Sequence, residues 1–502
     1  MIDKDIILTT INAKWIHPSL ALRLLKANLG SLEDRCEILE FNLRQPLAEK
    51  LQPLLDASAR VLGVSVSIWN HLAVIELLKE LKKLWPQKPV IVLGGPEVSH
   101  LPPGAEIFKY ADYVIRGEGE TAFRLLCEDI LLNENIINMK LHSTGSFVVS
   151  TRETSPLCFS VSSAVNNLID IKSAYHLYTD EDITKKLIYV ESSRGCPFNC
   201  EFCLSSVKTE GQAVREFEIE KFLTEMDLLI QRGAKTFKFL DRSFNINIPR
   251  ALKIINFFLD KINDSAPFVV HFEMIPSNFP PELIEALAKF PPGTLRLEIG
   301  IQTLNEQVSS RLKLAGAKER SNDCSKLLQT LSLLRRETNA IIHADLIAGL
   351  PGETLESFGE GFDRLYQALC DIENCGKNIA RPRLCAEIQL GILKLLPGTR
   401  ISRHIEMFKM RFNDIPPYNI EETSSLCAKD LLRITNFARF WELLVNRGLI
   451  FNENLLNFKE KIPVFFKFLG LSDKLFAYFG KNWGIDRNQL IVILKDNNFS
   501  YF

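Results

Sequence analysis

The segment SSRGCPFNCEFCLSS holds three cysteines in a C-x3-C-x2-C arrangement: Cys196, Cys200 and Cys203. Thiolates are good ligands for zinc and for iron–sulfur clusters. A structural zinc site usually has four ligands and often two C-x2-C pairs, and no partner pair lies downstream in this sequence. A four-iron cluster takes one thiolate per iron, so three cysteines leave one iron open to a small molecule. The spacing therefore favours a cluster with an open position over a zinc site or a group of buried thiols.

Polar residues that could bind a ligand follow several apolar stretches beyond the cysteines. The segment LEIGIQT places Glu298 and Gln302 on one face of a predicted strand, which suits a ribose or an amino-acid group. An ordinary hydrogen bond at the end of a strand is the competing interpretation. Two glycine-rich segments, GGPEVSH at 94–100 and GEGE at 117–120, follow predicted strands nearer the N-terminus. Each of these is weak evidence for a ligand when taken alone.

The cysteine motif, with aromatic Phe202 just before its last cysteine, resembles the signature of radical S-adenosylmethionine (SAM) enzymes. The resemblance covers residues 187–395 in strand order as well as in cysteines. It implies a [4Fe-4S] cluster held by the three cysteines, with the amino and carboxylate groups of SAM on the open iron. Cleavage of SAM would then give methionine and a 5′-deoxyadenosyl radical. The SAM contacts that it implies are Phe202, Asp241, Glu298, Gln302 and Asp345. The commoner glycine-glycine-glutamate version is absent at LDRSFN, which leaves the roles of Asp241 and Arg242 open.

The N-terminal segments, taken together and ahead of such a domain, resemble the cobalamin-binding domain of one large subgroup of this family. The subgroup in question also has a helical C-terminal domain of unknown function. The cobalamin contacts that this resemblance implies are Thr10, Asn12, Ser65, Ser67, Gly94, Gly95, Glu97, Gly117, Glu118, Gly119 and Glu120. The D-x-H-x-x-G motif, whose histidine replaces the lower cobalt ligand, has no copy here. His17 is a candidate for that position, but packing or hydrogen bonding is the commoner role for such a residue.

The elements that must position these residues follow from the hydrophobic pattern. Over the first 130 residues short apolar strands alternate with amphipathic helices, which predicts a parallel, doubly wound, Rossmann-like sheet with its ligand at the carboxyl ends of the strands. A second β/α series with six strand candidates suits a partial (β/α)6 barrel. From about residue 400 the pattern is mainly helical and rich in phenylalanine. The α/β chain is thus expected to comprise a cobalamin-binding domain (1–135), a linker (136–185), a radical SAM partial TIM barrel (186–400) and a helical C-terminal domain (401–502).

Composition limits the partners. With 502 residues and a formal net charge of -1, the sequence has no basic excess that would suggest a nucleic-acid partner. No run of about 18 uncharged apolar residues predicts a membrane span, and MIDKDIILTT indicates a first strand rather than a secretory signal. The 11 cysteines are an odd number and mostly scattered, which favours a reducing cytoplasm over a disulfide framework.

For such a cofactor set, methyl transfer to an unactivated carbon is the commonest chemistry, with cobalt taking the methyl group from one SAM and a second SAM supplying the radical. Rearrangement or cyclisation by the same cofactors is an alternative, as is a non-catalytic cobalamin or iron–sulfur sensor. Methylthio transfer is disfavoured, because Cys36 and Cys127 are too widely separated to hold the N-terminal cluster of those enzymes. The expected partners are an unidentified small-molecule or peptide substrate and an electron donor such as flavodoxin or ferredoxin. Cys370 and Cys375 lie close together, but two ligands do not make a second cluster.

Overall fold

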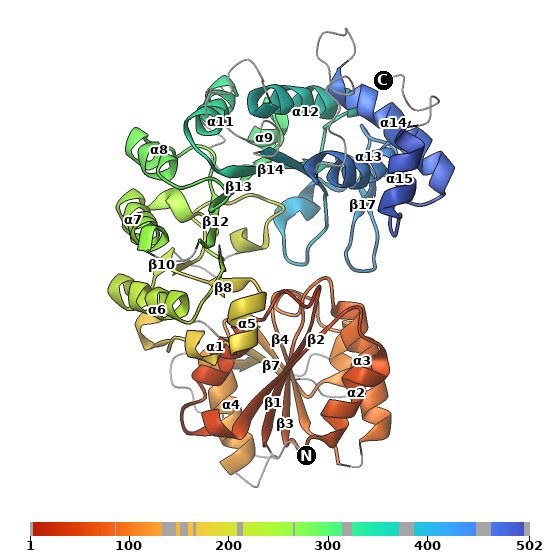
Figure 1. Cartoon of the computed structure of the whole chain (residues 1–502). Helices are drawn as coiled ribbons and strands as arrows, with labels where there is room; N and C mark the ends of the chain where they lie inside the picture. Colours follow the sequence, from red (N-terminus) through yellow and green to blue (C-terminus); the bar gives the residue numbers. More distant parts are fainter. Residues whose placement is uncertain are drawn as a thin grey trace. The chain divides into compact units, whose positions relative to one another are not determined.

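The computed structural model describes residues 4–85, 87–132, 147–150, 159–163, 167–207, 214–264, 267–313, 324–370, 386–447 and 463–495. The chain divides into two compact units, the first made of Met1–Gly195 and Lys208–Leu240, the second of Cys196–Val207 and Asp241–Phe502 (Figure 1). The segment with the three cysteines thus groups with the C-terminal half of the chain. The domain boundaries expected from the sequence stay a prediction.

A mostly parallel sheet forms the first unit. Its strands are β1 (Ile6–Asn12), β2 (Cys36–Asn42), β3 (Val61–Ser65), β4 (Val90–Gly94), β5 (Tyr113–Gly117), β6 (Phe147–Ser150) and β7 (Phe159–Ser163). They lie in the order β2-β1-β3-β4-β5-β7-β6, and β6 alone among these strands pairs in the antiparallel direction, with β7. Because β6 and β7 come from the segment expected to be a linker, part of that segment joins the sheet.

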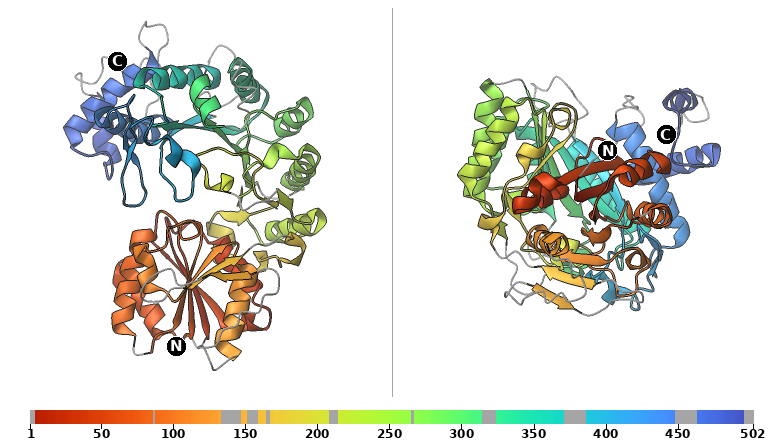
Figure 2. Two further views of the ribbon diagram at one scale, coloured as in Figure 1. Left: turned by 180° about the vertical axis from the view of Figure 1, so that it is seen from behind. Right: turned by 90° about the horizontal axis from the view of Figure 1, so that it is seen from below.

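Helices cover both faces of this sheet (Figure 2). They are α1 (Leu20–Ala27), α2 (Leu47–Asp56), α3 (His71–Leu84) and α4 (Glu120–Leu132). Side chains of one strand alternate between the faces, so Ile7 packs in a core with Leu54 of α2 and Leu77 of α3. Leu8 packs in a second core with Phe123 of α4. Strands buried on both faces are typical of a doubly wound sheet, which confirms the predicted fold class here.

The second β/α series begins in the first unit and continues in the second. In the first unit, β8 (Ile188–Val190) pairs in parallel with β11 (Thr236–Phe239), and β9 (Ser193–Arg194) pairs antiparallel with β10 (Arg215–Glu216). Helices α5 (Asp180–Lys185) and α6 (Ile219–Gln231) belong to the same unit.

In the second unit, β12 (Val269–Met274), β13 (Leu295–Gln302), β14 (Ile341–Ala348) and β15 (Ala386–Ile392) pair in parallel in that order. The helices of this series are α7 (Ile248–Asp264), α8 (Pro281–Ala288), α9 (Glu306–Arg311), α11 (Ser325–Glu337) and α12 (Leu355–Cys370). All six predicted strands form, and the parallel β/α organisation is confirmed. The curvature of a partial barrel stays a prediction.

Two of the C-terminal helices pack on α12 through aromatic rings. They are α13 (Ala428–Trp441), continued by the π-helix η10 (Glu442–Asn446), and α14 (Val464–Phe479); α15 (Arg487–Lys495) follows them in the chain. The ring of Phe362 lies 5.2 Å from that of Phe437 and 4.9 Å from that of Trp441, centroid to centroid. A Cβ on Gly359 would approach the Phe465 ring to 2.6 Å, so only glycine lets α14 come this close. The predicted helical C-terminal region is confirmed.

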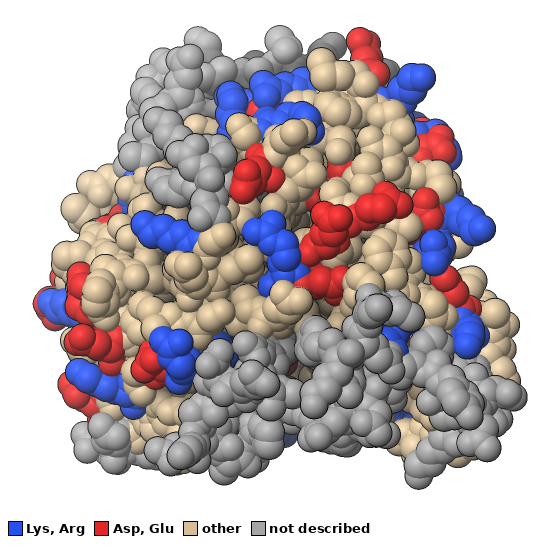
Figure 3. Space-filling view, turned by 90° about the horizontal axis from the view of Figure 1, so that it is seen from above, with Lys and Arg blue, Asp and Glu red and all other residues tan. Residues whose placement is uncertain are grey.

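No helix in the described part is long and apolar enough to cross a membrane. On the face drawn in Figure 3, basic side chains group near the top and acidic side chains form a run right of the centre, among other residues. Both signs are thus present on this face.

Candidate active site

A pocket in the second unit is lined by all three cysteines of the motif. Cys196, Cys200 and Cys203 are each half-buried. The backbone N–H of Cys203 donates to the carbonyl of Cys200 over 3.1 Å, which turns the chain between these two residues. The other lining residues are Phe198, Phe202, Ser205, Arg242, Glu273, Met274, Ile275, Pro276, Glu298, Gly300, Gln302 and Asp345.

A buried glutamate inside the motif holds the cysteine segment in place. Glu201 is fully buried, and its Oε2 lies 2.8 Å from Nε2 of His404. Its Oε1 lies 2.5 Å from Nη2 of Arg403, and its carbonyl accepts a hydrogen bond of 2.8 Å from the N–H of Ile401. The local sequence does not predict this contact, because Glu201 and His404 lie 203 residues apart. The one sequence signal is an acidic residue between two cysteines.

One wall of the pocket is formed by polar side chains at the carboxyl ends of β12, β13 and β14. Glu273 pairs in register with Glu298, and Asp345 with Gly300, so these side chains meet at one edge of the sheet. Nη1 of Arg242 lies 3.5 Å from Oε2 of Glu273. Among the lining residues that the structure describes, Arg242 is the only cation. The pocket thus offers one positive group beside several carboxylates and three thiols.

Gln302 occupies a backbone position that few residues tolerate. Its φ is 67°, after a bulge where the pairing of β13 with β14 shifts register. A Cβ on Gly300 would lie 2.4 Å from Nε2 of Gln302, so glycine leaves the space that this amide occupies. The next residue, Thr303, donates its hydroxyl to Oε1 of Glu353 over 2.5 Å. Burial raises the pKa of Glu353 to about 8, against the lowering effect of the Thr303 hydrogen bond.

The structure brings together most of the residues that the resemblance implied for SAM. Phe202, Glu298, Gln302 and Asp345 all line the pocket with the cysteines. Asp241 does not, because its side chain is only 1% exposed, and its neighbour Arg242 lines the pocket instead. A shared strand face predicted Glu298 and Gln302, and the resemblance implied Phe202 and Asp345. The loop residues Phe198 and Ser205 carried no signal of their own.

The residues expected to bind cobalamin are divided by the structure into several groups. Thr10 and Ser67 are buried at the ends of β1 and β3, and the hydroxyl of Thr10 donates to the carbonyl of Ser65 over 3.0 Å. Gly95 has a φ of 106°, and a Cβ there would lie 2.5 Å from the carbonyl oxygen of Val66. Packing inside the unit therefore already requires this glycine, whereas at Gly94 a Cβ would meet no atom closer than 4.0 Å.

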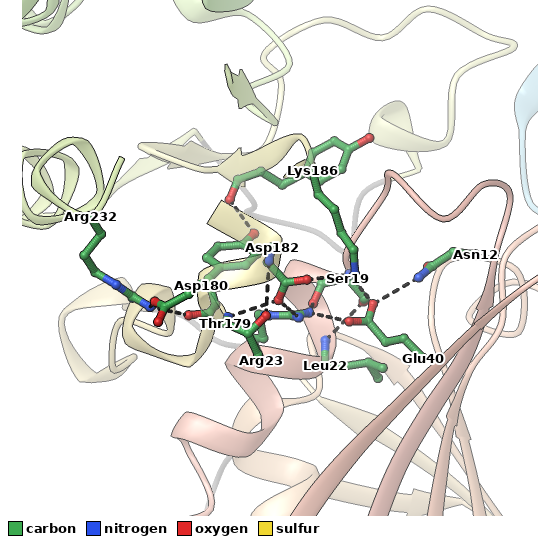
Figure 4. Close-up of polar contacts among 12 residues, drawn as sticks. Asn12, Ser19, Leu22, Arg23, Glu40, Thr179, Asp180, Asp182, Lys186 and Arg232 are labelled. Atoms are coloured by element: carbon green, nitrogen blue, oxygen red, sulfur yellow. Dashed lines mark hydrogen bonds and ion pairs between the residues drawn. The ribbon is translucent and has the colours of Figure 1, made fainter. Parts of the chain in front are cut away.

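Asn12 belongs to a hydrogen-bonded network drawn in Figure 4. Its Nδ2 donates to Oε1 of Glu40 over 3.0 Å, and the same oxygen accepts a bond of 2.5 Å from the N–H of Ser19. Arg23 donates to Oε2 of Glu40 over 2.8 Å and to Asp182 over 2.7 Å. The network joins the loop after β1 to α5 within the first unit.

The acidic side chains of the glycine-rich segments are paired with protein groups. Oε1 of Glu97 lies 2.8 Å from Nδ1 of His71, and both side chains are buried. Glu118 forms an ion pair with Arg215, and Oε1 of Glu120 accepts a bond of 2.7 Å from Arg194. The backbone around Gly117, whose φ is 86°, and Gly119 is what this segment would present to a ligand.

His17 is engaged in a similar way. Its Nδ1 lies 2.8 Å from the hydroxyl of Tyr189, and burial, aided by Lys14 and Lys238, lowers its pKa. This geometry fits the hydrogen-bonding role that the sequence analysis kept as the alternative to cobalt ligation.

Two family models match the chain in the order expected. The B12 binding domain model matches residues 6–127, and the Radical SAM superfamily model matches residues 190–365. The chain belongs to the cobalamin-binding radical SAM family. Its radical SAM match includes the three cysteines and the strands that end at the pocket, and its B12-binding match includes the strands β1 to β5.

Two curated proteins are similar to this one over much of the chain. The cobalamin-dependent radical SAM methyltransferase TokK of Streptomyces tokunonensis is 25% identical over 342 residues, which cover 65% of this chain and 48% of TokK. The 2-(S-pantetheinyl)-carbapenam-3-carboxylate methyltransferase of Streptantibioticus cattleyicolor is 26% identical over 61% of this chain and 45% of its own. This chain therefore spans about half the length of these curated relatives.

A solved structure supports the same fold. The radical SAM methyltransferase TsrM from Kitasatospora setae aligns with a TM-score of 0.56 and 17% identity over 82% of this chain and 79% of its own. At that identity the likeness concerns the fold alone.

The remaining cysteines bear on the methylthio-transfer alternative. Cys36 and Cys127 are both buried, and burial raises the pKa of Cys36 to about 12 and that of Cys127 further. Such thiols resist deprotonation, so they do not resemble cluster ligands. Cys375 lies outside the described residues.

Proposed function

We propose that this chain is a cobalamin-dependent radical SAM enzyme that transfers a methyl group to an unactivated carbon of a small-molecule or peptide substrate. The observation that carries the proposal is the pocket with three cysteines, one arginine and several carboxylates, in a chain with a B12-binding domain. When bound, a [4Fe-4S] cluster and SAM supply a 5′-deoxyadenosyl radical, and cobalamin carries the methyl group.

In this proposal Cys196, Cys200 and Cys203 hold three irons and leave the fourth to SAM. Three half-buried thiol donors that line one pocket suit such a cluster in their chemistry. Arg242 is suited to the carboxylate of SAM, since it is the cation among the described lining residues. The carboxylates opposite it suit the ammonium group and the ribose hydroxyls.

The remaining SAM residues are assigned by their surroundings. Phe202 offers an aromatic face to the adenine, and Gln302 offers an amide held in a strained position. Asp241 is buried, so we propose that it acts through its neighbour Arg242 rather than by touching SAM.

Cobalamin is proposed to bind at the carboxyl ends of β1, β3, β4 and β5, where Thr10, Asn12, Ser65, Ser67 and the glycine-rich segments lie. The backbone of Gly94, Gly95, Gly117 and Gly119 would serve this contact. Glu97, Glu118 and Glu120 would support these loops through their ion pairs rather than meet the corrin.

Methyl transfer is preferred over rearrangement or cyclisation because the two curated relatives described above, which align with 65% and 61% of this chain, are methyltransferases by name. A low-potential cluster needs a reducing setting, so we place the protein in the cytoplasm with flavodoxin or ferredoxin as electron donor. We assign this chain no specific substrate on the basis of the relatives' names.

The test is incubation of the reduced, cluster-loaded and cobalamin-loaded protein with SAM that carries a labelled methyl group. The proposal predicts 5′-deoxyadenosine and S-adenosylhomocysteine, and no 5′-deoxyadenosine without reductant. A fully loaded protein that forms neither product would favour the sensor. 5′-Deoxyadenosine without S-adenosylhomocysteine, with the label retained on methionine, would indicate the other cobalamin-dependent chemistry.

A further inference from the structure

The strand order of the first unit contains a topological switch point between β1 and β3. From β1 the chain moves to β2 on one side, whereas β3 pairs with the other side of β1. The connecting helices lie on opposite faces, since Leu22 of α1 and Leu77 of α3 belong to different cores. Open α/β sheets bind ligands outside the carboxyl ends of the strands at such a point. The loops after β1 and β3 flank it.

Each of these two loops carries an exposed tryptophan. Trp15, after β1, is 47% exposed, and Trp69, after β3, is 53% exposed. Of the other tryptophans, Trp85 at the far end of α3 is 8% exposed and Trp441 is 1% exposed, whereas Trp483, outside the first unit, is 72% exposed. Leu72, near Trp69 in the sequence, is exposed as well. Exposed apolar side chains in the loops that flank a ligand-binding point indicate a surface that a partner covers.

The loop with Trp69 is fixed to the end of β1 by a buried asparagine. Nδ2 of Asn70 lies 3.1 Å from the carbonyl oxygen of Ile11 and 3.2 Å from Oγ1 of Thr10. Its Oδ1 accepts a bond of 2.8 Å from the N–H of Ser67. The side chain of Asn70 is fully buried, so the loop is held while the indole beside it stays exposed.

The loop with Trp15 is fixed at both of its ends by one carboxylate. Asn12 and the N–H of Ser19 donate to the same oxygen of Glu40, and Arg23 donates to the other, as Figure 4 shows. Nζ of Lys186 lies 4.9 Å from the centroid of the Trp15 ring, within the range of a cation–π contact. Polar contacts therefore hold both loops in place while their indoles stay exposed.

We propose that Trp15 and Trp69 form an apolar platform for the corrin ring of cobalamin at this switch point. A corrin has two broad, largely apolar faces and a rim of amide groups. An indole matches it with a flat apolar surface and one N–H donor. The inference rests on the proposed function, because it names the side chains that would hold a cofactor of that function.

Binding of hydroxocobalamin to the full chain tests the proposal without any turnover. Equilibrium dialysis should show a dissociation constant about tenfold higher for Trp15→Ala and for Trp69→Ala than for the unaltered protein, because each loses an apolar stacking surface. Trp15→Phe and Trp69→Phe keep an aromatic ring and should bind within about threefold of the unaltered chain. Unchanged thermal unfolding of each variant confirms that the sheet is intact.

Tryptophan fluorescence gives a second readout, because bound cobalamin absorbs the emission of nearby indoles. Trp15→Phe and Trp69→Phe should each lower the amplitude of quenching on binding. Trp85→Phe is the matched control, since it removes a buried indole at the other end of α3 and should leave most of the quenching.

Two outcomes separate this inference from the proposed function. If both alanine variants bind cobalamin within twofold of the unaltered chain, the tryptophan platform is wrong while the cofactor assignment stands. If the unaltered chain itself binds no cobalamin, the proposed function falls and the platform with it.

Discussion

Cys196, Cys200 and Cys203 are half-buried and line one pocket, where each thiol of the proposed cluster site would lose its proton on binding iron. This is the part of the site that local sequence spacing predicts well. A turn between Cys200 and Cys203 needs only neighbouring residues. Arg242 is harder to predict, because the choice between it and Asp241 depends on which side chain the folded loop buries.

Replacing one ligand should remove the cluster. Cys203→Ala leaves two thiolates, and we expect iron to fall from about four to under one per chain, with at least a 100-fold loss of 5′-deoxyadenosine. Iron analysis and product quantification on anaerobic protein check this. Cys427→Ala, an exposed cysteine outside the pocket, is the matched control and should change neither quantity. A cluster that survives Cys203→Ala would contradict the assignment.

The buried acid Glu353 should make stability depend on pH. Burial raises its pKa from 4.5 to about 8, so the folded state keeps a proton that the unfolded state loses. Its contribution to the free energy of unfolding therefore decreases as pH rises from about 4.5 to about 8, by up to ~1.4 kcal/mol per pH unit. Glu353→Gln keeps a neutral polar group there and should lose this dependence.

The comparison is chemical denaturation of both proteins between pH 5 and pH 8.5, a range set by that pKa. As pH rises, the free energy of unfolding of Glu353→Gln should increase relative to that of the original protein. Glu356→Gln, at an exposed position three residues away, is the control and should follow the original protein. Parallel curves for Glu353→Gln and the original would show that Glu353 is ionised in the folded protein.

At the scale of elements, the most consequential contact joins β9 to the GEGE segment. Arg194, two residues before Cys196, binds Glu191 and Glu120 over 2.7 Å each and lies 3.4 Å from Glu118. Arg215 also pairs with Glu118, and its strand is the partner of the strand of Arg194. The strands β9 and β10 precede and follow the cysteine segment in the chain, so their pairing forms the stem of that segment.

This network indicates that GEGE positions the stem of the cysteine segment. Arg194→Gln should lower cluster loading and SAM cleavage about tenfold and leave the dissociation constant of cobalamin unchanged, because several carboxylates lose a shared partner. Arg194→Lys should recover only part, since lysine lacks the planar fork. Arg124→Gln breaks a partly exposed ion pair with Glu128 and serves as control.

The same experiment decides what Glu118 and Glu120 do. Weaker cobalamin binding with normal SAM cleavage in Arg194→Gln would indicate that both glutamates belong to the cobalamin site, as the sequence resemblance implied. The sequence alone could not separate these roles, because Glu120 and Arg194 lie 74 residues apart and no periodicity links them.

At the scale of the whole molecule, hydrophobic periodicity predicted both β/α series and the helical C-terminal region. Where the chain divides depends on long-range packing, which hydrophobic periodicity does not report, so the domain boundaries stay a prediction. Strands β6 and β7 extend the first sheet although their segment lacks the β/α rhythm, and the ring of Phe362 ties α12 to the C-terminal helices. The pocket lined by the cysteines lies at the ends of predicted strands, so the sequence pattern could predict its place. The tertiary contacts could not be predicted in this way.

The central claim is that one chain holds a cluster with an open iron together with cobalamin. Quantification of iron, sulfide, zinc and corrinoid in protein purified without oxygen and supplied with these components tests it most directly. The account predicts about four irons, about four sulfides and one corrinoid per chain. Zinc at the cysteines without bound corrinoid would contradict it.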